Sequence, residues 1–296
     1  MEPIVHTIFE QQTGTWQYIV ACPNTRQAVI IDPVLNLSLT DFKITATSAD
    51  ELLAVAETNN YTVTRLLETH AHADHLTGAF YLQQRLLTKN QPKALISTGH
   101  RIRQVQETFA AKYGVAQADL DQAFDHLFDD NETFPVGDLT AQVLHLPGHT
   151  PDHSGYRIGS NVFTGDSIFN PDVGSARCDF PNGDARALYN SMQKLLALPA
   201  HFRLYTGHDY PPADFGREPL AFVTVAEQLK GNKHVKQGTS EDEFVEWRRT
   251  RDATLNEPRL LHQALQVNIR GGRLPVSSDG SQRTFLLVPF HIPQFR

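Results

Sequence analysis

Three imidazoles and a carboxylate lie within the seven residues Thr69–His75, THAHADH. Neutral imidazoles and carboxylates are ligands for borderline divalent metals, and an HxHxDH spacing lets one loop present several of them together. The stretch therefore predicts a metal site. A chance grouping is the alternative, because the chain contains 14 histidines.

Three further candidate ligands each follow an apolar run that ends beside a glycine. They are His149 in LPGHT, Asp166 in FTGDS and His208 in YTGHD. The stretch VTRLLETH similarly predicts a strand that runs directly into the histidine cluster. In layered α/β folds, functional groups gather just beyond strand ends, where loops converge over a rigid sheet. Four strand ends are therefore expected to deliver ligands to one site, and this argues against a chance grouping.

Hydrophobic periodicity indicates which elements position these loops. Apolar runs of strand length predict strands, and apolar residues at helical spacing predict helices. Strands are expected over 16–22 and 27–33, and helices over 49–60 and 78–88. A helical appendage is expected from about residue 238, followed by the apolar run TFLLVPF. The chain contains no internal repeat and no low-complexity linker.

A helical pair is expected over residues 101–131. Four apolar residues in this range fall at positions i, i+4, i+7 and i+8 of one helical face, namely Leu120, Phe124, Leu127 and Phe128. Such a face predicts a helix that caps the core. A lid or a dimer contact is the alternative.

Composition restricts the class of protein. The chain has 296 residues, 40% of them hydrophobic, which is enough for one large domain or two modest ones. The formal net charge is −7, and a nucleic-acid partner is not expected because polyanion binding draws on clustered Lys and Arg. No segment approaches the roughly 20 apolar residues of a membrane span, and MEPIVHTIFEQQTG is not a secretory leader, so a cytoplasmic location is expected. The two cysteines, Cys22 and Cys178, exclude a disulfide framework.

The ordered signature HxHxDH, His, Asp, His resembles that of the metallo-β-lactamase superfamily over roughly residues 15–210. The resemblance implies an α/β (α+β) fold, the αββα sandwich of two mixed β-sheets flanked by helices. It also implies a metal site at one edge of the sandwich. A catalytic domain is then expected over 1–237, with 101–131 as a helical insertion. A C-terminal extension over 238–296 is expected to pack on the same domain and to contribute to the substrate pocket.

Within this superfamily the sequence looks most like the persulfide dioxygenases, also called sulfur dioxygenases. The similar stretches are DPV, THAHADHLTG, LPGHTPDHSGY, FTGDSIF, GSARCDF and GHDY. The segment EPRLLHQALQVNIRGG (257–272) is similar to the C-terminal segment of that subfamily and unlike the tail of glyoxalase II. The resemblance thus covers nearly the whole chain, with 101–131 as the main departure.

The resemblance implies that one Fe(II) per chain is held by His70, His149 and Asp166. This is a 2-His-1-carboxylate set, which leaves open positions on the iron for oxygen and substrate. The four remaining ligand-type residues are His72, Asp74, His75 and His208. They would orient the first three through hydrogen bonds, or they would complete a site for zinc or a second metal as in hydrolytic relatives.

The enzyme implied by the resemblance oxidises glutathione persulfide with O2 and water to sulfite and glutathione. The alternative enzyme is a glyoxalase II-like thioesterase, in which two metals generate a hydroxide that attacks a glutathione thioester. A catalytically silent ligand-binding protein is a third reading, and the intact ligand set argues against it. The expected partners are glutathione persulfide and O2, with no nucleic acid and no membrane, and a homodimer is left open.

Arginines that pair with the two carboxylates of glutathione are expected in the substrate pocket. The candidates are Arg177 in GSARCDF and Arg270 in QVNIRGG, with Tyr210 and Asn268 in supporting polar roles. A structural ion pair is the alternative for each arginine.

The other polar residues near the motifs receive structural interpretations. Cys22 is assigned to the core, and Cys178 to a buried inert thiol rather than one activated by Arg177. Asp152 is read as a turn residue, while a role of His153 in orienting a ligand is left open. Surface or core roles are assigned to His6, His100, His126, His145, His201, His234, His262 and His291.

Overall fold

The first of two large sheets combines antiparallel and parallel strands in the order β1-β2-β3-β6-β8-β9. The neighbours among β1, β2 and β3 pair antiparallel, whereas β3, β6, β8 and β9 run parallel. The strands are β1 (Ile4–Glu10), β2 (Thr15–Ala21), β3 (Gln27–Ile31), β6 (Thr62–Leu67), β8 (Leu95–Gly99) and β9 (His126–Phe128). Because β3 and β6 are parallel, the loops that follow them leave the sheet at the same edge.

The second large sheet has the order β10-β11-β12-β13-β14-β15 and is antiparallel except for the parallel pair β13 and β14. Its strands are β10 (Thr133–Val136), β11 (Leu139–His145), β12 (Ser154–Ile158), β13 (Asn161–Gly165), β14 (Arg203–Thr206) and β15 (Phe222–Thr224). A small third sheet contains β5 (Lys43–Thr45), β4 (Val34–Ser38) and β7 (Leu76–Thr77).

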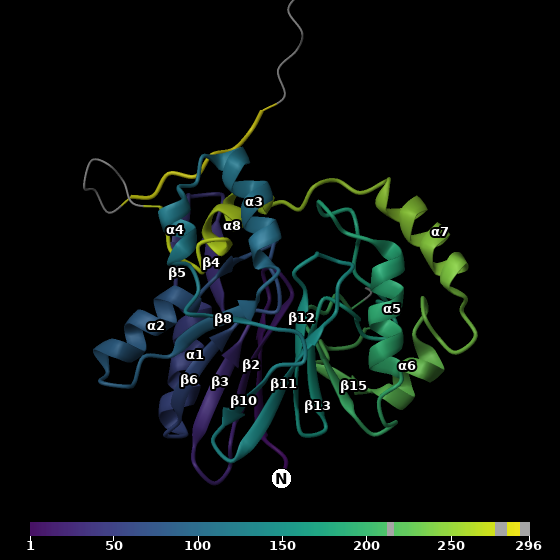
Figure 1. Ribbon diagram of the computed structural model, residues 1–296, viewed down its shortest axis with the longest axis horizontal. Coiled ribbons are helices and arrows are strands. Elements are labelled where there is room, and N and C mark those ends of the chain that lie inside the picture. Colours follow the sequence, from purple (N-terminus) through teal and green to yellow (C-terminus); the bar gives the residue numbers. More distant parts are fainter. Residues whose placement is uncertain (212–215, 276–282, 291–296) are drawn as a thin grey trace, which may run out of the picture.

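Helices cover the outer faces of the two large sheets (Figure 1). Beside the first sheet lie α1 (Thr47–Thr58) and α2 (Ala79–Thr88), and beside the second lie α5 (Ala185–Leu196), α6 (Val225–Gly231) and α7 (Glu241–Asp252). A third group stands at one end of the sandwich, with α3 (Ile102–Tyr113), α4 (Gln117–Asp121) and α8 (Leu261–Asn268). The predicted αββα sandwich of two mixed sheets is confirmed. The structure, a computed structural model, describes residues 1–211, 216–275 and 283–290.

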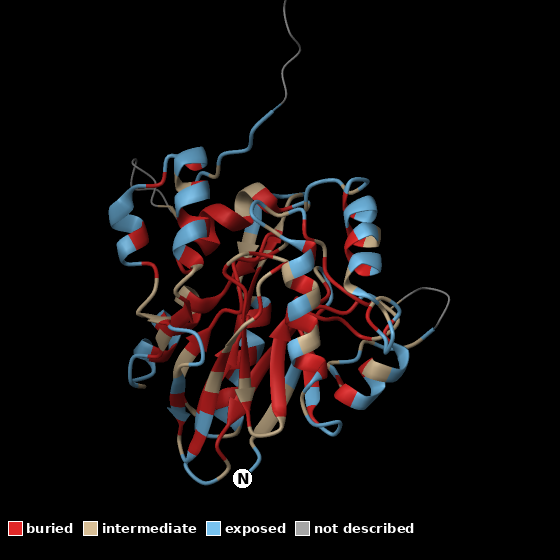
Figure 2. Cartoon of the chain, turned by 45° about the vertical axis from the view of Figure 1, so that its right-hand side comes forward, coloured by how far each residue is buried: buried red, intermediate tan, exposed pale blue. Residues whose placement is uncertain are grey.

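The core lies in layers between and outside the sheets, and Figure 2 shows the central strands as mostly buried. Tyr18, Ile31, Phe128, Tyr156 and Phe163 fill the space between the sheets, each 1% exposed or less. Burying a side chain of this kind contributes roughly 1.5–3 kcal/mol. All residues of β2 and β13 are buried, including the polar side chains of Gln17 and Thr164, as expected for strands that are covered on both faces.

The helical pair predicted over 101–131 is correct only in its first part. The segment from His126 to Phe128 is a strand that pairs in parallel with β8 at the edge of the first sheet. Phe128 therefore enters the core between the sheets, whereas Leu127 packs on the α3 and α8 side. The prediction that all four apolar residues share one helical face was wrong. Leu127 and Phe128 lie on a strand, where neighbouring side chains point to opposite faces of the sheet, although their spacing from Leu120 also fits a helix.

The segment beyond residue 238 packs at two places, on the outer face of the second sheet and at one end of the sandwich. Phe244 and Val245 of α7 join the apolar cluster of α5, while Leu265 and Ile269 pack against α3 and the loop that holds the histidine cluster. The run Thr284–Phe290 has no regular secondary structure. Residues 276–282 and 291–296, which include His291, lie outside the described residues.

Candidate metal centre

The seven candidate ligands come from four loops, each of which begins where a strand of a large sheet ends. The loop after β6 carries the histidine cluster, and those after β11, β13 and β14 carry His149, Asp166 and His208. Backbone hydrogen bonds hold the ends together: Gly207 N–H donates to Gly165 O, and Trp16 N–H donates to Gly207 O, both at 2.8 Å. The structure thus brings together the loops that the sequence pattern grouped.

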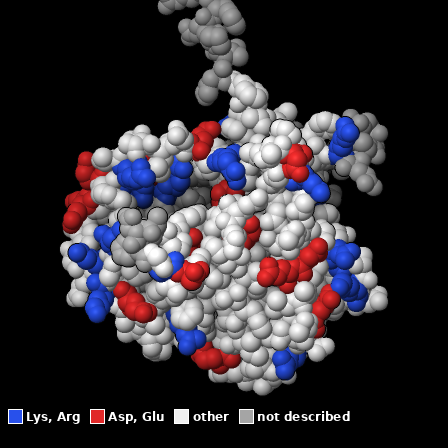
Figure 3. Space-filling model, turned by 180° about the vertical axis from the view of Figure 1, so that it is seen from behind, with Lys and Arg blue, Asp and Glu red and all other residues white. Residues whose placement is uncertain are grey.

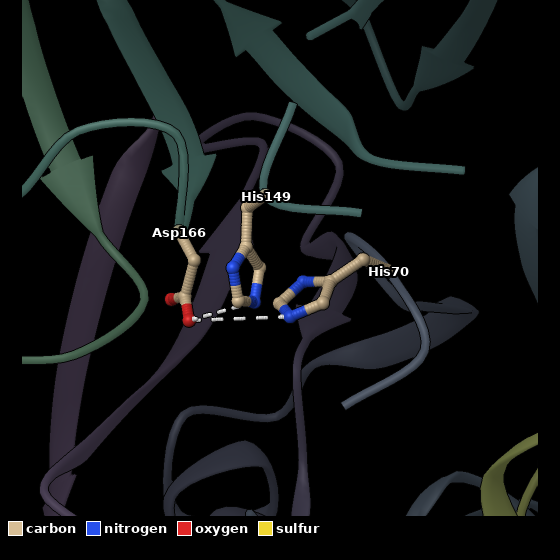
Figure 4. A group of neighbouring side chains, drawn as sticks. All are labelled: His70, His149 and Asp166. Atoms are coloured by element: carbon tan, nitrogen blue, oxygen red, sulfur yellow. Dashed lines mark ion pairs between the residues drawn. The ribbon is translucent and has the colours of Figure 1, made fainter. Parts of the chain in front are cut away.

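His70, His149 and Asp166 form one compact group, in which one nitrogen or oxygen atom from each lies within 4.8 Å of the others. Asp166 Oδ2 is 4.0 Å from His70 Nε2 and 3.7 Å from His149 Nε2. Figure 4 shows the three side chains converging on one point. A divalent cation at this point would have two imidazoles and one carboxylate as ligands.

The hydrogen bonds on the far side of each imidazole determine which nitrogen faces Asp166. His149 Nδ1 donates to the carbonyl of Arg177 at 2.7 Å. His70 Nδ1 lies 2.9 Å from Thr69 Oγ1, whose hydroxyl donates to Asp32 Oδ2 at 2.8 Å, so the imidazole is the donor to Thr69. Both Nε2 atoms therefore carry lone pairs, as metal ligation requires. Burial holds the pKa of His70 well below its usual value, which keeps this imidazole neutral.

His208 links the first group to Asp74. Its Nδ1 lies 2.8 Å from Asp166 Oδ1, and its Nε2 lies 2.8 Å from Asp74 Oδ2. Burial alone would lower the pKa of His208, but the two carboxylates outweigh it and raise the pKa well above its usual value. For Asp166, burial is outweighed by His208, and the pKa falls to about 2. Both nitrogens of His208 are thus engaged by carboxylates.

A second group consists of His72, Asp74 and His75. His72 Nε2 lies 3.1 Å from Asp32 Oδ1 and 3.3 Å from Glu68 Oε2, so two buried carboxylates orient this ring. Its Nδ1 and His75 Nε2 are buried, and neither has a hydrogen-bond partner among the described residues. Buried polar atoms are seldom left unpaired, and a bound cation would satisfy both nitrogens. The donor set of the centre therefore fits divalent metals.

A cavity of about 510 Å³ opens above the centre and is lined in part by Asp74, His149, Asp166 and His208. Of the four residues predicted to bind substrate, Arg177 and Tyr210 line this cavity, whereas Asn268 and Arg270 do not. Arg177 and Tyr210 therefore line the same cavity as four of the candidate metal ligands.

The two arginines predicted to bind substrate both have intramolecular partners. The guanidinium of Arg177 pairs with Asp179 and donates to the carbonyl of Asn256 at 2.9 Å. Arg270 donates to Asp119 at 3.2 Å and to the carbonyl of Gln266 at 2.6 Å. These contacts match the structural ion pair that was the alternative for each.

Asn268 holds the ligand loop in place. Its amide nitrogen donates to the carbonyls of His72 and His75, each at 2.8 Å, and its oxygen accepts from Thr77 N–H at 2.8 Å. The last residue of α8 thus ties the C-terminal segment to the histidine cluster. Substrate contact by Asn268 finds no support in this geometry.

Comparison with known proteins shows which family the chain belongs to. Residues 12–208 match the model of the metallo-beta-lactamase superfamily. The chain belongs to this superfamily. The match ends at His208, the last of the candidate ligands in the chain, and so covers every loop of the metal centre.

Individual superfamily members extend the similarity to most of the chain. "Glyoxylase B2" of Dictyostelium discoideum is 43% identical over 95% of each chain. The mitochondrial persulfide dioxygenase ETHE1 of Bos taurus is 28% identical over 91% of this chain and 89% of its own, and a hydroxyacylglutathione hydrolase of Nitrosococcus oceani is 31% identical over 69% and 67%. The crystal structure of ETHE1 from Myxococcus xanthus superposes with a TM-score of 0.71 and 30% identity, over 91% of this chain and all of that one.

Three polar residues, His153, Asp152 and Asp32, support the ligands. The sequence left this role open for His153 and did not indicate it for Asp152 or Asp32. His153 Nε2 accepts from the backbone N–H of Asp166 at 2.9 Å, and its ring stacks on His70 with centroids 4.7 Å apart. Asp152 lies in a turn, as predicted, and its buried carboxylate also accepts from Ala71 N–H at 2.8 Å, which holds the ligand loop. Asp32 directly follows β3, and this strand-end position is the signal that could have identified it.

Neither cysteine is among the candidate ligands of the metal centre. Cys22 and Cys178 are buried, and burial raises the pKa of the Cys178 thiol, which favours the protonated, unreactive form.

None of the helices within 1–211, 216–275 and 283–290 is long and apolar enough to cross a membrane.

Proposed function

We propose that the protein is a glutathione-dependent persulfide dioxygenase. It would convert glutathione persulfide, O2 and water into sulfite and glutathione at a single Fe(II) held by His70, His149 and Asp166. Bound iron would supply the redox chemistry that lets O2 react with sulfur. The resemblance to persulfide dioxygenases in sequence and in structure supports this reaction.

The observation that carries the proposal is the engagement of His208. In a two-metal hydrolase this imidazole would have to offer a lone pair to a second cation. In this structure both its nitrogens are within 2.8 Å of carboxylate oxygens, on Asp166 and Asp74. Asp166 is thereby left with Oδ2 directed at His70 and His149. This arrangement favours one metal, with His208 and Asp74 as a hydrogen-bonded support.

A glyoxalase II-like thioesterase is the second candidate, and a specific observation favours it. The unpaired nitrogens of His72 and His75 lie in the second group, where another cation would bind them. Two metals in such a site lower the pKa of bound water and provide a hydroxide for thioester hydrolysis. Both candidates act on a glutathione derivative, so they differ in metal count and in oxygen consumption.

Oxygen uptake by anaerobically purified, Fe(II)-loaded protein tests the proposal. With glutathione persulfide, we expect O2 consumption matched by sulfite release, one iron per chain, and no hydrolysis of a glutathione thioester. The variant Asp166→Ala should lose iron and turnover, while Asp129→Ala, which removes an exposed carboxylate, should keep both. Thioester hydrolysis without oxygen uptake, at two metals per chain, would establish the second candidate instead.

A further inference from the structure

Part of the cavity wall comes from the segment of the chain that follows the superfamily match. The match ends at residue 208. The charged lining residues beyond this point are Lys233, Arg248, Arg251 and Arg259, all of them cationic. Figure 3 shows Lys and Arg side chains gathered beside a hollow in that face of the molecule. The acidic lining residues, Asp74 and Asp166, belong to the metal centre at the floor. The cavity thus places a cationic rim above a metal site.

The four rim cations differ in how far they are already paired. Arg248 is bound by Asp252 and donates to the carbonyl of Ala176 at 3.1 Å, and Arg251 donates to Thr254 Oγ1 at 3.0 Å. For Lys233 and Arg259, no side-chain hydrogen bond or ion pair occurs within the described residues. Lys233 and Arg259 are therefore the cations with charge to offer to a ligand.

His234 adds a neutral donor to the same wall. Its Nδ1 accepts the backbone N–H of Ser175 at 3.0 Å, which leaves the proton on Nε2. The ring packs against Trp247, with centroids 3.7 Å apart and the ring planes inclined by 35°. His234 lines the cavity, and its uncharged Nε2–H is a donor of the kind that pairs with an amide carbonyl. Two cations and such a donor suit an acidic peptide.

We propose that Lys233 and Arg259 select substrates by their two carboxylates, holding an acidic peptide thiol at the cavity mouth while its sulfur lies at the metal centre. This inference rests on the proposed function for the identity of the peptide, glutathione. It transfers carboxylate recognition away from Arg177 and Arg270, whose guanidinium groups have intramolecular partners. An ammonium and a guanidinium each form charge-assisted hydrogen bonds with carboxylate oxygens.

The test is calorimetric titration of glutathione into the full-length, metal-loaded protein. The double variant Lys233→Met/Arg259→Met should bind glutathione about 100-fold more weakly, roughly tenfold for each carboxylate. The matched control is Lys236→Met, an exposed cation three residues away that does not line the cavity, and it should bind as the unaltered protein does. With glutathione persulfide as substrate, KM should rise in the double variant while kcat changes little.

Glutathione diethyl ester, in which both carboxylates are esterified and uncharged, tests whether Lys233 and Arg259 bind the carboxylates. The unaltered protein should bind the diester about 100-fold more weakly than glutathione, and the double variant should bind both about equally. If the double variant still bound the diester more weakly than glutathione, the proposal would be overturned, since other residues would then bind the carboxylates. Tighter binding of coenzyme A than of glutathione, lost in the double variant, would also overturn it by assigning the rim to phosphates. Binding is measured without turnover, so these outcomes remain distinct from a failure of the dioxygenase reaction.

Discussion

At the scale of single residues, the orientation of the three candidate ligands depends on hydrogen bonds to neighbouring groups. The carbonyl of Arg177 orients His149 by accepting its Nδ1–H. His70 is oriented by its hydrogen bond to Thr69 Oγ1, which in turn donates to Asp32. Asp166 is held from both ends, because His208 contacts its carboxylate and His153 accepts its backbone N–H. Such partners set the orientation and basicity of metal ligands. Substitutions behind the ligands are therefore expected to weaken metal binding.

His153→Ala should lower metal affinity by about 10- to 100-fold, because Asp166 N–H loses its acceptor. His153→Gln should lose less, since its side-chain oxygen can still accept this bond. Chelator competition measures the affinity directly, and His126→Ala, on an edge strand away from the centre, serves as the control. Equal affinity of His153→Ala and the unaltered protein would show that this bond does not position Asp166.

Because the pKa of His234 is lowered in the folded protein, we expect the protein to lose stability on mild acidification. Burial, with smaller effects of Lys233 and Arg248, lowers the pKa of His234 to about 3 from its ordinary 6.5. Below pH 6.5 the unfolded chain therefore takes up a proton that the folded chain refuses, so this contribution to stability is present above pH 6.5 and is lost as the pH falls toward 3. Denaturant unfolding at pH 7 and pH 5 should show a loss of about 1–2 kcal/mol that His234→Gln lacks. An unchanged pH dependence in the variant would contradict this account.

At the scale of elements, α7 secures part of the cavity wall to the second sheet. Its residue Asp252 accepts from the backbone N–H of Cys178 at 2.8 Å and pairs with Arg248 one turn earlier on the helix. Both side chains of the pair are less than 10% exposed. The same helix carries Asp242, whose partner is Arg186 at the surface. One helix thus holds a buried pair and an exposed pair.

Asp252→Ala should destabilise the protein by about 3–5 kcal/mol, because it leaves the Arg248 guanidinium buried without its counter-charge. Asp242→Ala is the matched control and should change the free energy of unfolding far less, since its side chain is 89% exposed. Chemical denaturation of both variants measures the difference. Similar losses in the two variants would show that the burial of the Arg248 pair does not matter for stability.

At the scale of the whole molecule, the metal centre joins the two large sheets. His70 follows β6 of the first sheet, whereas His149 and Asp166 follow β11 and β13 of the second. A cation bound by all three would hold the sheets together at this edge. It would bind the folded state and not the unfolded chain, so binding adds directly to stability.

Metal loading should therefore raise the free energy of unfolding by about 4 kcal/mol when free metal is at 1,000 times Kd. Scanning calorimetry with and without a chelator should show the corresponding rise in Tm, of about 6 °C for a chain of this length. Asp166→Ala should show no rise. A chelator effect of equal size in Asp166→Ala would place the stabilising metal elsewhere.

The sequence alone was enough to predict the ligand-bearing loops, because they rest on local patterns. The sandwich was implied by the resemblance of the ordered ligand signature to the metallo-β-lactamase superfamily. Apolar runs of strand length precede His70, His149, Asp166 and His208, and the structure has a strand at each of these places. These signals need only the spacing of residues along the chain.

Only the tertiary structure decided which groups support the ligands and which face the substrate. His153 and Asp32 meet Asp166 and Thr69 through contacts between loops far apart in the sequence. Arg177 is occupied by Asp179 and Asn256, a fact that its neighbours GSARCDF could suggest only in part. The strand at His126–Phe128 likewise exists because β8 offers it a free edge. Such pairings depend on the folded arrangement of several segments, and no periodicity within one segment encodes them.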